Sequence, residues 1–234
     1  MEVEEVMRKL KSLENRKRAL HSQRFFKTGP GEYGEGDLFL GIPVPELRRV
    51  AKQCASLSLR EIRQLLASPL HEERLVALLL LVAHFQQGDE GERERIYSFY
   101  LQHTRFVNNW DLVDLSAVKI VGAFLFNKER EILFEMASSS SLWERRIAIM
   151  ATFFFIKEND FSDALKIGAL LLHDEEDLIH KAVGWMLREV GKRHRPTEER
   201  FLKEHYRTMP RTMLRYAIEH FPEERRQGYL KGTL

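Results

Sequence analysis

Apolar residues recur three or four positions apart along most of the chain, as in Val6, Leu10 and Leu13 and again in Ile132 and Met136. This spacing places them on one face of a helix, whereas the strict alternation typical of a half-buried strand is nearly absent. The pattern predicts an all-α protein of about a dozen helices, each about 10 to 20 residues long, joined by short connections.

Signals for helix starts support this prediction. Ser58–Glu61 and Ser141–Glu144 both have the Ser-x-x-Glu pattern of a capping box, in which each side chain accepts a hydrogen bond from an otherwise unpaired amide. Prolines are tolerated before or in the first turn of a helix, where no N–H is needed. The prolines placed in this way are Pro45, Pro69, Pro196, Pro210 and Pro222.

A four-residue pattern, a charged residue followed by an apolar helical run with small residues, recurs along the chain. It begins at Arg74, Asp114, Arg146, Lys181 and Arg215, at intervals of 40, 32, 35 and 34 residues. Intervals of this length are typical of helix–turn–helix repeats that stack into a solenoid. We therefore predict a HEAT- or armadillo-like α-solenoid of about six stacked helix pairs, forming one domain over residues 1–234.

Equivalent positions of successive repeats project to the same side of a solenoid. The four cations of the pattern are then expected to line a concave basic face, with Asp114 among them. The alternative is that these residues are half-buried and pair with acids of neighbouring repeats.

The net charge hides an uneven distribution. The 234 residues include 44% hydrophobic residues, enough for a real core, and have a formal net charge of +2. Counted by segment, residues 1–27 carry +4, residues 28–178 carry −8 and residues 179–234 carry +6. If the basic ends share one side, the protein has a surface for a polyanion; otherwise they are ordinary solvated helix faces.

Several classes of protein are disfavoured. A lone cysteine, Cys54, excludes an intramolecular disulfide and is expected to be a buried, inert thiol. The longest apolar run, Leu75–Ala83, is too short to span a bilayer, so we expect a cytoplasmic protein without membrane contact. The nine histidines include no His-x-x-x-His pair, so His71, His84 and His180 are interpreted as helix-face residues. We predict no metal and no cofactor.

Residues 29–34 match the pattern G-x-G-x-x-G. A dinucleotide site needs a strand before this pattern and a helix directly after it, and neither is predicted here. The segment is better interpreted as a tight surface loop whose backbone could approach a phosphate or a partner, with Tyr33 as a contact residue.

Two tryptophans share a helix face with charged residues. Trp110 and Asp114 are four residues apart, and Lys181, Trp185 and Arg188 have the same kind of spacing. Each tryptophan could also simply be part of the core. Asp111, in the first turn, is explained by the helix dipole, but Asp114 lies too far along the helix for that.

A carboxylate beside an indole, within a set of cations, favours a positively charged group held against a polyanion. An alkylated purine in DNA fits this description, because alkylation of a ring nitrogen makes the base cationic and weakens its glycosidic bond. An ionised Asp114 could stabilise the positive charge that develops on the sugar and orient water.

The chain resembles the AlkD-type DNA alkylation repair glycosylases, which are built of HEAT-like repeats. The segments that carry the resemblance are Phe39–Ile42 with Pro45–Arg49, Trp110–Asp114, Trp143–Arg146 and Lys181–Glu189. The W-D-x-V-D and K-A-x-G-W-x-L-R-E patterns are specific in combination, and the similarity extends over most of the chain.

This resemblance implies a monofunctional, metal-free enzyme that excises N3- or N7-alkylated purines, such as 3-methyladenine and 7-methylguanine, from double-stranded DNA. It places Asp114 at the catalytic carboxylate position, Trp110 and Trp185 at the aromatic lesion contacts and Arg146 at a nearby basic position. Tyr33 is assigned to a further contact with the lesion.

The expected contacts with the DNA backbone are Arg74, Lys181, Arg188 and Arg215, and a monomer is expected. The alternative function is a non-catalytic solenoid that binds DNA structures or a protein partner through the same surface.

Overall fold

The computed structural model describes residues 2–234. These residues form two compact units, the first ending at Ser116 and the second comprising Ala117–Leu234. Within the described residues there is no strand, and the isolated bridge between Leu38 and Leu70 is the one β-type pairing. The all-α prediction is confirmed, whereas a single domain over residues 1–234 stays a prediction.

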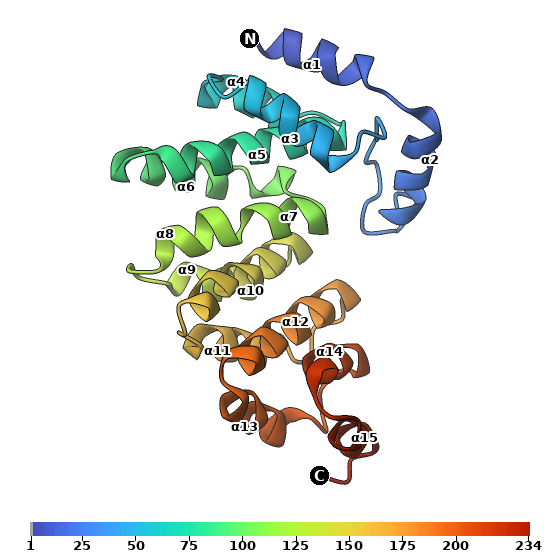
Figure 1. Ribbon diagram of the computed structural model, residues 1–234, viewed down its shortest axis with the longest axis vertical. Helices are drawn as coiled ribbons and strands as arrows, with labels where there is room; N and C mark the ends of the chain where they lie inside the picture. The colour runs from blue at the N-terminus through green and yellow to red at the C-terminus, as the bar shows by residue number, and fades with distance from the viewer. Residues whose placement is uncertain (1) are drawn as a thin grey trace. The chain divides into compact units, whose positions relative to one another are not determined.

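The first unit consists of helices that follow one another in layers, with α2 beside the layers of α3–α5 (Figure 1). Its elements are α1 (Val3–Ser12), α2 (Arg16–Phe25), α3 (Val44–Gln53), α4 (Leu59–Leu66), α5 (His71–Gln87), α6 (Glu90–Gln102), η1 (Thr104–Phe106) and α7 (Trp110–Ser116).

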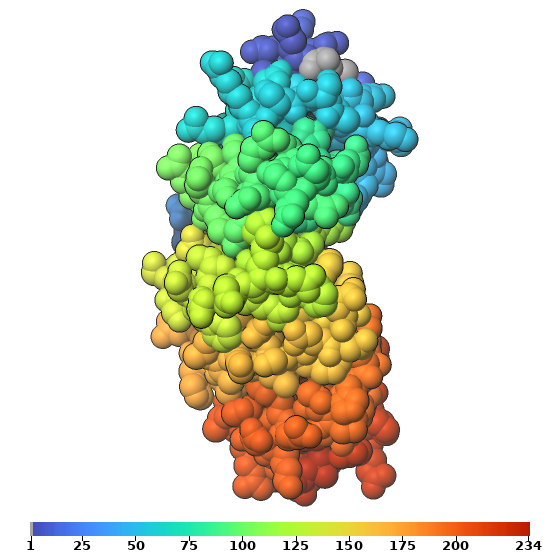
Figure 2. Space-filling view, turned by 90° about the vertical axis from the view of Figure 1, so that its left-hand side faces the viewer, coloured from blue at the N-terminus to red at the C-terminus, as the bar shows by residue number. Residues whose placement is uncertain are grey.

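The second unit is also helical, and in Figure 2 its residues form consecutive bands of colour from yellow-green to red. Its elements are η2 (Val118–Gly122), α8 (Ala123–Leu125), α9 (Glu131–Ala137), α10 (Leu142–Lys157), α11 (Ser162–Leu170), α12 (Asp177–Arg193), α13 (Arg195–His205), α14 (Arg211–Ala217), η3 (Ile218–His220) and α15 (Glu223–Lys231). Each helix packs mainly against helices near it in sequence, as in HEAT-like repeats.

The predicted helix starts are confirmed. Ser58 and Glu61 form a complete capping box at α4. At α10 the Ser141 side chain accepts from the Glu144 amide, but the Glu144 carboxylate binds Ser139 instead, so that box is half formed. The predicted helix length of about 10 to 20 residues was wrong for α7, α9 and α14, which have seven residues each.

The recurring pattern marks equivalent places in five helices. Its first residue is the fourth of α5 and the fifth of α7, α10, α12 and α14. The predicted register is therefore present in the structure, although equivalent positions differ in exposure.

The core of each unit forms around a long apolar helix. In the first unit, the run from Leu75 to Val82 is buried in α5, which packs against α3, α4, α6 and α7. In the second unit, α10 is buried from Arg146 to Thr152 and packs against α9, α11 and α12. Cys54 is buried as predicted, and burial raises the pKa of its thiol. None of the helices among residues 2–234 is both long enough and apolar enough to cross a membrane.

Two glycines in the second unit allow helices to approach closely, and their replacement tests this packing. A Cβ atom on Gly122 would lie 2.2 Å from the carbonyl oxygen of Ala151 in α10. A Cβ atom on Gly184 would lie 2.4 Å from the carbonyl oxygen of Met213 in α14. We expect Gly122→Ala and Gly184→Ala each to lower the free energy of unfolding by about 1–3 kcal/mol, because the clash outweighs alanine's higher helix propensity.

Gly91 of α6 is a matched control, because the nearest atom to its added Cβ would be 3.5 Å away. Gly91→Ala is expected to leave stability unchanged or raise it by up to about 1 kcal/mol. Denaturant unfolding measures all three, and equal effects at the three positions would contradict the close approach.

Candidate active site

The candidate catalytic residues of the first unit lie on α7. Trp110 is its first residue, and its amide donates to the Asn109 side chain at 2.9 Å. Asp114 is half-buried one turn later. Burial raises the pKa of Tyr100, and the negative charge of Asp114 adds to this shift, so the Asp114 carboxylate lies near the buried phenol. Both residues lie on one helix, as their spacing predicted, and that the indole and the carboxylate are neighbours stays a prediction.

Trp110 contacts two further aromatic rings that sequence reasoning did not single out. The Phe26 ring stacks on the indole with centroids 5.3 Å apart, and the Phe25 ring meets it edge to face at 5.9 Å. Phe25 is 59% exposed, so much of its ring faces solvent beside the indole. The signal in the sequence was a pair of phenylalanines directly after a basic segment.

A buried hydrogen-bond network supports the start of α7. The His71 ring, at the start of α5, places Nε2 at 2.9 Å from Asp111 Oδ2 and Nδ1 at 3.3 Å from Asp37 Oδ2. Two carboxylate acceptors require an N–H on both ring nitrogens, which only the imidazolium has. Burial alone would lower the pKa of His71, but the hydrogen bonds with Asp111 and Asp37 outweigh it and raise that pKa.

The interpretations of His71 and Asp111 from sequence were therefore incomplete. His71 is buried rather than a helix-face residue, and Asp111 binds it in addition to lying in the first turn of α7. The periodicity of α5 alone could not reveal this, because both carboxylates come from distant segments.

Arg74 belongs to the same network. Its Nη2 lies 2.6 Å from Asp37 Oδ1 and its Nη1 donates to the Ser68 carbonyl at 2.9 Å, with both members of the ion pair about 4% exposed. Burial would raise the pKa of Asp37, but the hydrogen bond from His71 and the charge of Arg74 hold it below its usual range. For Arg74, the geometry matches the alternative of an internal ion pair and gives no support to the predicted contact with the DNA backbone.

The glycine-rich loop is closed on itself. The Gly29 and Gly31 amides donate to the Glu32 and Glu35 carboxylates at 2.8 and 2.9 Å, and the Gly34 amide donates to the Lys27 carbonyl at 3.0 Å. These amides are therefore not directed at a phosphate. The loop ends at Asp37, whose carboxylate accepts hydrogen bonds from His71 and Arg74 of α5 and from the Asn109 side chain just before α7.

Tyr33 lies in this loop and is half-buried. Its hydroxyl donates to the Phe25 carbonyl at 3.4 Å, and the Lys27 ammonium lies 6.0 Å from its ring centroid. Tyr33 is thus a neighbour of the backbone that carries Phe25, while Phe25 itself contacts Trp110.

The second unit holds a separate group of predicted residues, most of them on α12. Trp185 is half-buried, donates from Nε1 to Glu189 at 3.1 Å and lies 5.8 Å from the Phe153 ring. Lys181 is 40% exposed with Asp177 at 2.7 Å, and Arg188 pairs with Glu219.

The two remaining cations of this unit differ from each other. Arg146 of α10 is buried, with Nη1 donating to the Leu178 carbonyl at 2.5 Å, whereas Arg215 of α14 is exposed. Arg146 is thus buried like Arg74, but its hydrogen bond goes to a backbone carbonyl and not to an acid of a neighbouring repeat.

Comparisons with known proteins show the family of the chain and structures with a similar fold. A profile of the DNA alkylation repair enzyme family matches residues 6–221. Among solved structures, a predicted DNA alkylation repair enzyme from Enterococcus faecalis is similar with a TM-score of 0.71 and 20% identity, covering 90% of this chain and 97% of that one. AlkD2 from Streptococcus mutans is similar with a TM-score of 0.56 and 17% identity, covering 88% and 98%. No curated protein matches the sequence. Since the profile spans nearly the whole chain, the protein belongs to the DNA alkylation repair enzyme family.

Proposed function

We propose that the protein is a DNA glycosylase that hydrolyses the N-glycosidic bond of cationic N3- and N7-alkylated purines in duplex DNA. The observation that carries this proposal is the pair of Trp110 and Asp114 on α7, in a chain of the DNA alkylation repair enzyme family. Lys181, Arg188 and Arg215, three cations of the second unit, are proposed to bind the DNA backbone, and Trp185 and Tyr33 to add contacts to the lesion.

The chemistry needs only one carboxylate. A purine alkylated at N3 or N7 already carries a positive charge, so it can leave with the bonding electron pair and become neutral without receiving a proton. Positive charge develops on the deoxyribose as the bond breaks. Asp114 would stabilise that charge, as glycosidase carboxylates do, and orient the water that adds to C1′ and loses its proton.

The aromatic groups would recognise the same positive charge. The face of an indole attracts a cation by about 0.5–2 kcal/mol. The stack of Phe26 on Trp110 fixes the plane of that indole, and Phe25 leaves an aromatic edge exposed beside it. These aromatic groups would therefore favour cationic over neutral lesions.

The direct test is release of base from duplex DNA methylated with dimethyl sulfate, measured by chromatography of the free bases. We expect 7-methylguanine and 3-methyladenine in the supernatant. Binding of duplex DNA without release of either base would reject the glycosylase proposal and favour the non-catalytic alternative.

Trp110→Ala is expected to reduce excision of cationic lesions more than that of a neutral one. The loss of cation–π attraction corresponds to about 2- to 30-fold for 7-methylguanine. Single-turnover rates on 7-methylguanine and on a neutral lesion such as 1,N6-ethenoadenine measure the difference. Trp185→Ala gives the same comparison in the second unit. A uniform loss for both lesions would indicate a packing defect instead.

A further inference from the structure

The buried His71 side chain connects the hydrogen-bond network at the start of α7 to the aromatic residues around Trp110. Its ring stacks on Phe39 with centroids 4.5 Å apart and lies tilted against the Phe26 ring at 5.1 Å. Phe26 in turn stacks on the Trp110 indole at 5.3 Å. A buried imidazole is therefore separated from the proposed lesion contact by a single ring.

The residues on both sides of Trp110 are tied to the same network. Asp111, the next residue, accepts from His71 Nε2 at 2.9 Å, and Asp37 accepts from Nδ1 of the same ring at 3.3 Å. The Asn109 side chain, just before Trp110, donates to Asp37 at 3.3 Å and accepts from the Trp110 amide at 2.9 Å. The backbone of Trp110 is thus held on both sides by groups that depend on the two carboxylates bound to His71.

This network is complete only when His71 carries its proton. The charged groups that interact with its ring are Asp37 from the glycine-rich loop, Asp111 from α7 and Arg74 from α5, while the two phenylalanine rings are uncharged. In neutral His71 one ring nitrogen has a lone pair instead of an N–H, and this lone pair would face a carboxylate oxygen. Loss of the proton therefore breaks one of the two hydrogen bonds and leaves an excess negative charge in a buried place.

We propose that the His71 imidazolium is the positioning residue of the candidate active site. It holds Asp111 and Asp37 together, and this fixes the start of α7 and the Trp110 indole at its first position. When His71 loses its proton, the start of α7 is released and the indole is no longer held in one orientation for the lesion. This inference rests on the proposed function, because it states how that same site depends on pH.

A decline in base release with rising pH follows from this role. Burial alone would lower the pKa of His71, but the hydrogen bonds with Asp111 and Asp37 outweigh it and raise that pKa above its ordinary value of 6.5. Positioning is therefore complete below about pH 6.5 and is lost as pH rises through the higher folded value. The proposed chemistry by itself gives no such decline, since a carboxylate such as Asp114 stays ionised as pH rises and a cationic purine leaves without receiving a proton.

The test is the pH profile of the single-turnover rate of 3-methyladenine release, for wild type and for His71→Gln. The nucleoside of 3-methyladenine, unlike that of 7-methylguanine, has no ring N–H whose loss would cancel its positive charge. The wild-type rate should fall above about pH 6.5 in a step that follows one proton. The rate of His71→Gln should be about 10- to 100-fold lower at about pH 6.5, because a displacement of about 1 Å can cost this much, and should not change with pH above that.

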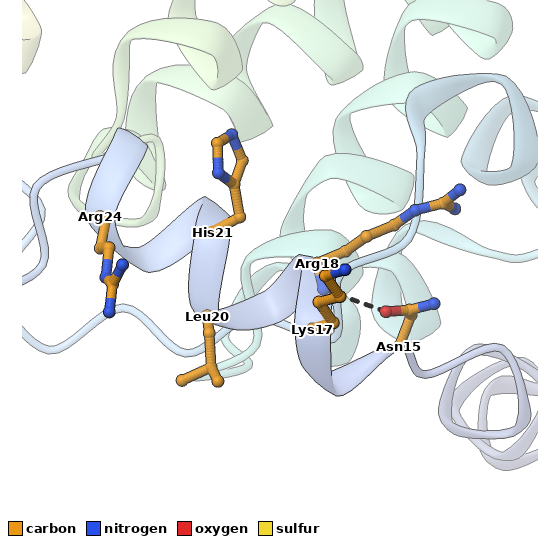
Figure 3. Close-up of a pocket in the computed structure, with 6 residues that line it drawn as sticks. All are labelled: Asn15, Lys17, Arg18, Leu20, His21 and Arg24. Carbon is orange, nitrogen blue, oxygen red and sulfur yellow. Dashed lines mark hydrogen bonds between the residues drawn. The ribbon is translucent and has the colours of Figure 1, made fainter.

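Two further variants make the profile specific to the network. Asp111→Asn removes the carboxylate that raises the pKa of His71 most, so the decline in rate should move to lower pH. His21→Gln is the matched control, since His21 is exposed on α2 and lines a surface hollow with Arg18 and Arg24 (Figure 3). This control should keep the wild-type rate and profile. If His71→Gln fails to fold, the shift in Asp111→Asn decides.

A second readout follows Trp110 itself and does not need catalysis. Trp143→Phe and Trp185→Phe together leave Trp110 as the one tryptophan of the chain. Its fluorescence emission should change in a single transition above about pH 6.5, because the orientation of the indole depends on the His71 proton. The same protein with His71→Gln should lack this transition.

These measurements separate the inference from the proposed function. If wild type releases 3-methyladenine and His71→Gln shows the same decline with pH, the positioning role is wrong and the glycosylase proposal stands. If wild type releases no base at any pH but the Trp110 emission follows His71, the positioning role stands and the glycosylase proposal fails. A rate that does not decline up to about pH 9, in wild type or in Asp111→Asn, would also overturn the positioning role.

Discussion

Asp114→Asn is expected to lower the single-turnover rate of 7-methylguanine release by about 100- to 1,000-fold. This is the cost typical of removing one preorganised electrostatic group from the site where charge develops in the transition state. Asparagine keeps the size of the side chain but cannot balance the positive charge on the sugar. Because Asp114 is half-buried at the fifth position of α7, the substitution should leave the helix intact.

The rate should be measured with enzyme in excess over methylated duplex, and the affinity for unmethylated duplex in parallel. Affinity should be unchanged or slightly higher, since a negative charge near a polyanion is removed. Glu94→Gln, an equally conservative change at an exposed position of α6, is the control and should keep the wild-type rate. An Asp114→Asn protein that is folded and as fast as wild type would remove Asp114 from the mechanism.

Much of the architecture was predictable because local signals determine it. The helical class, the start of α4 at Ser58 and the register of the recurring pattern all come from spacing within a few residues. The lengths of α7 and α14 were not predictable in this way. Whether a turn of helix continues depends on packing against neighbours, which overrides propensity.

The site was predictable only as far as its residues share a helix. Trp110 and Asp114 are four residues apart, and the structure places both on α7. Phe25 and the Asp37–His71–Asp111 network join segments about 35 to 85 residues apart, and no periodicity relates them. The repeat register likewise predicted the position of Arg74 along α5. It could not predict that Arg74 is buried in an ion pair with Asp37.

Asp37→Asn is expected to lower the free energy of unfolding by about 3–5 kcal/mol, the range found when one partner of a buried ion pair is removed. The substitution leaves the Arg74 guanidinium buried without a counter-charge and takes one of two carboxylates from His71. Urea unfolding followed by circular dichroism measures the change. Asp163→Asn is a control, because it breaks an ion pair with Arg130 that is more exposed than the pair of Asp37 and Arg74. A smaller loss of stability is expected, since the Asp160 carboxylate still binds that guanidinium.

The pH dependence and a double-mutant cycle test the cause of this loss. The pKa of Asp37 is lowered by folding, so its contribution is present above the unfolded pKa of about 3.9 and disappears as pH falls through the lower folded value. The difference between wild type and Asp37→Asn should therefore shrink on acidification below about pH 4. Adding Arg74→Met should recover part of the stability lost in Asp37→Asn, because the unpaired buried charge is gone. Strictly additive losses would mean that the two side chains do not stabilise each other.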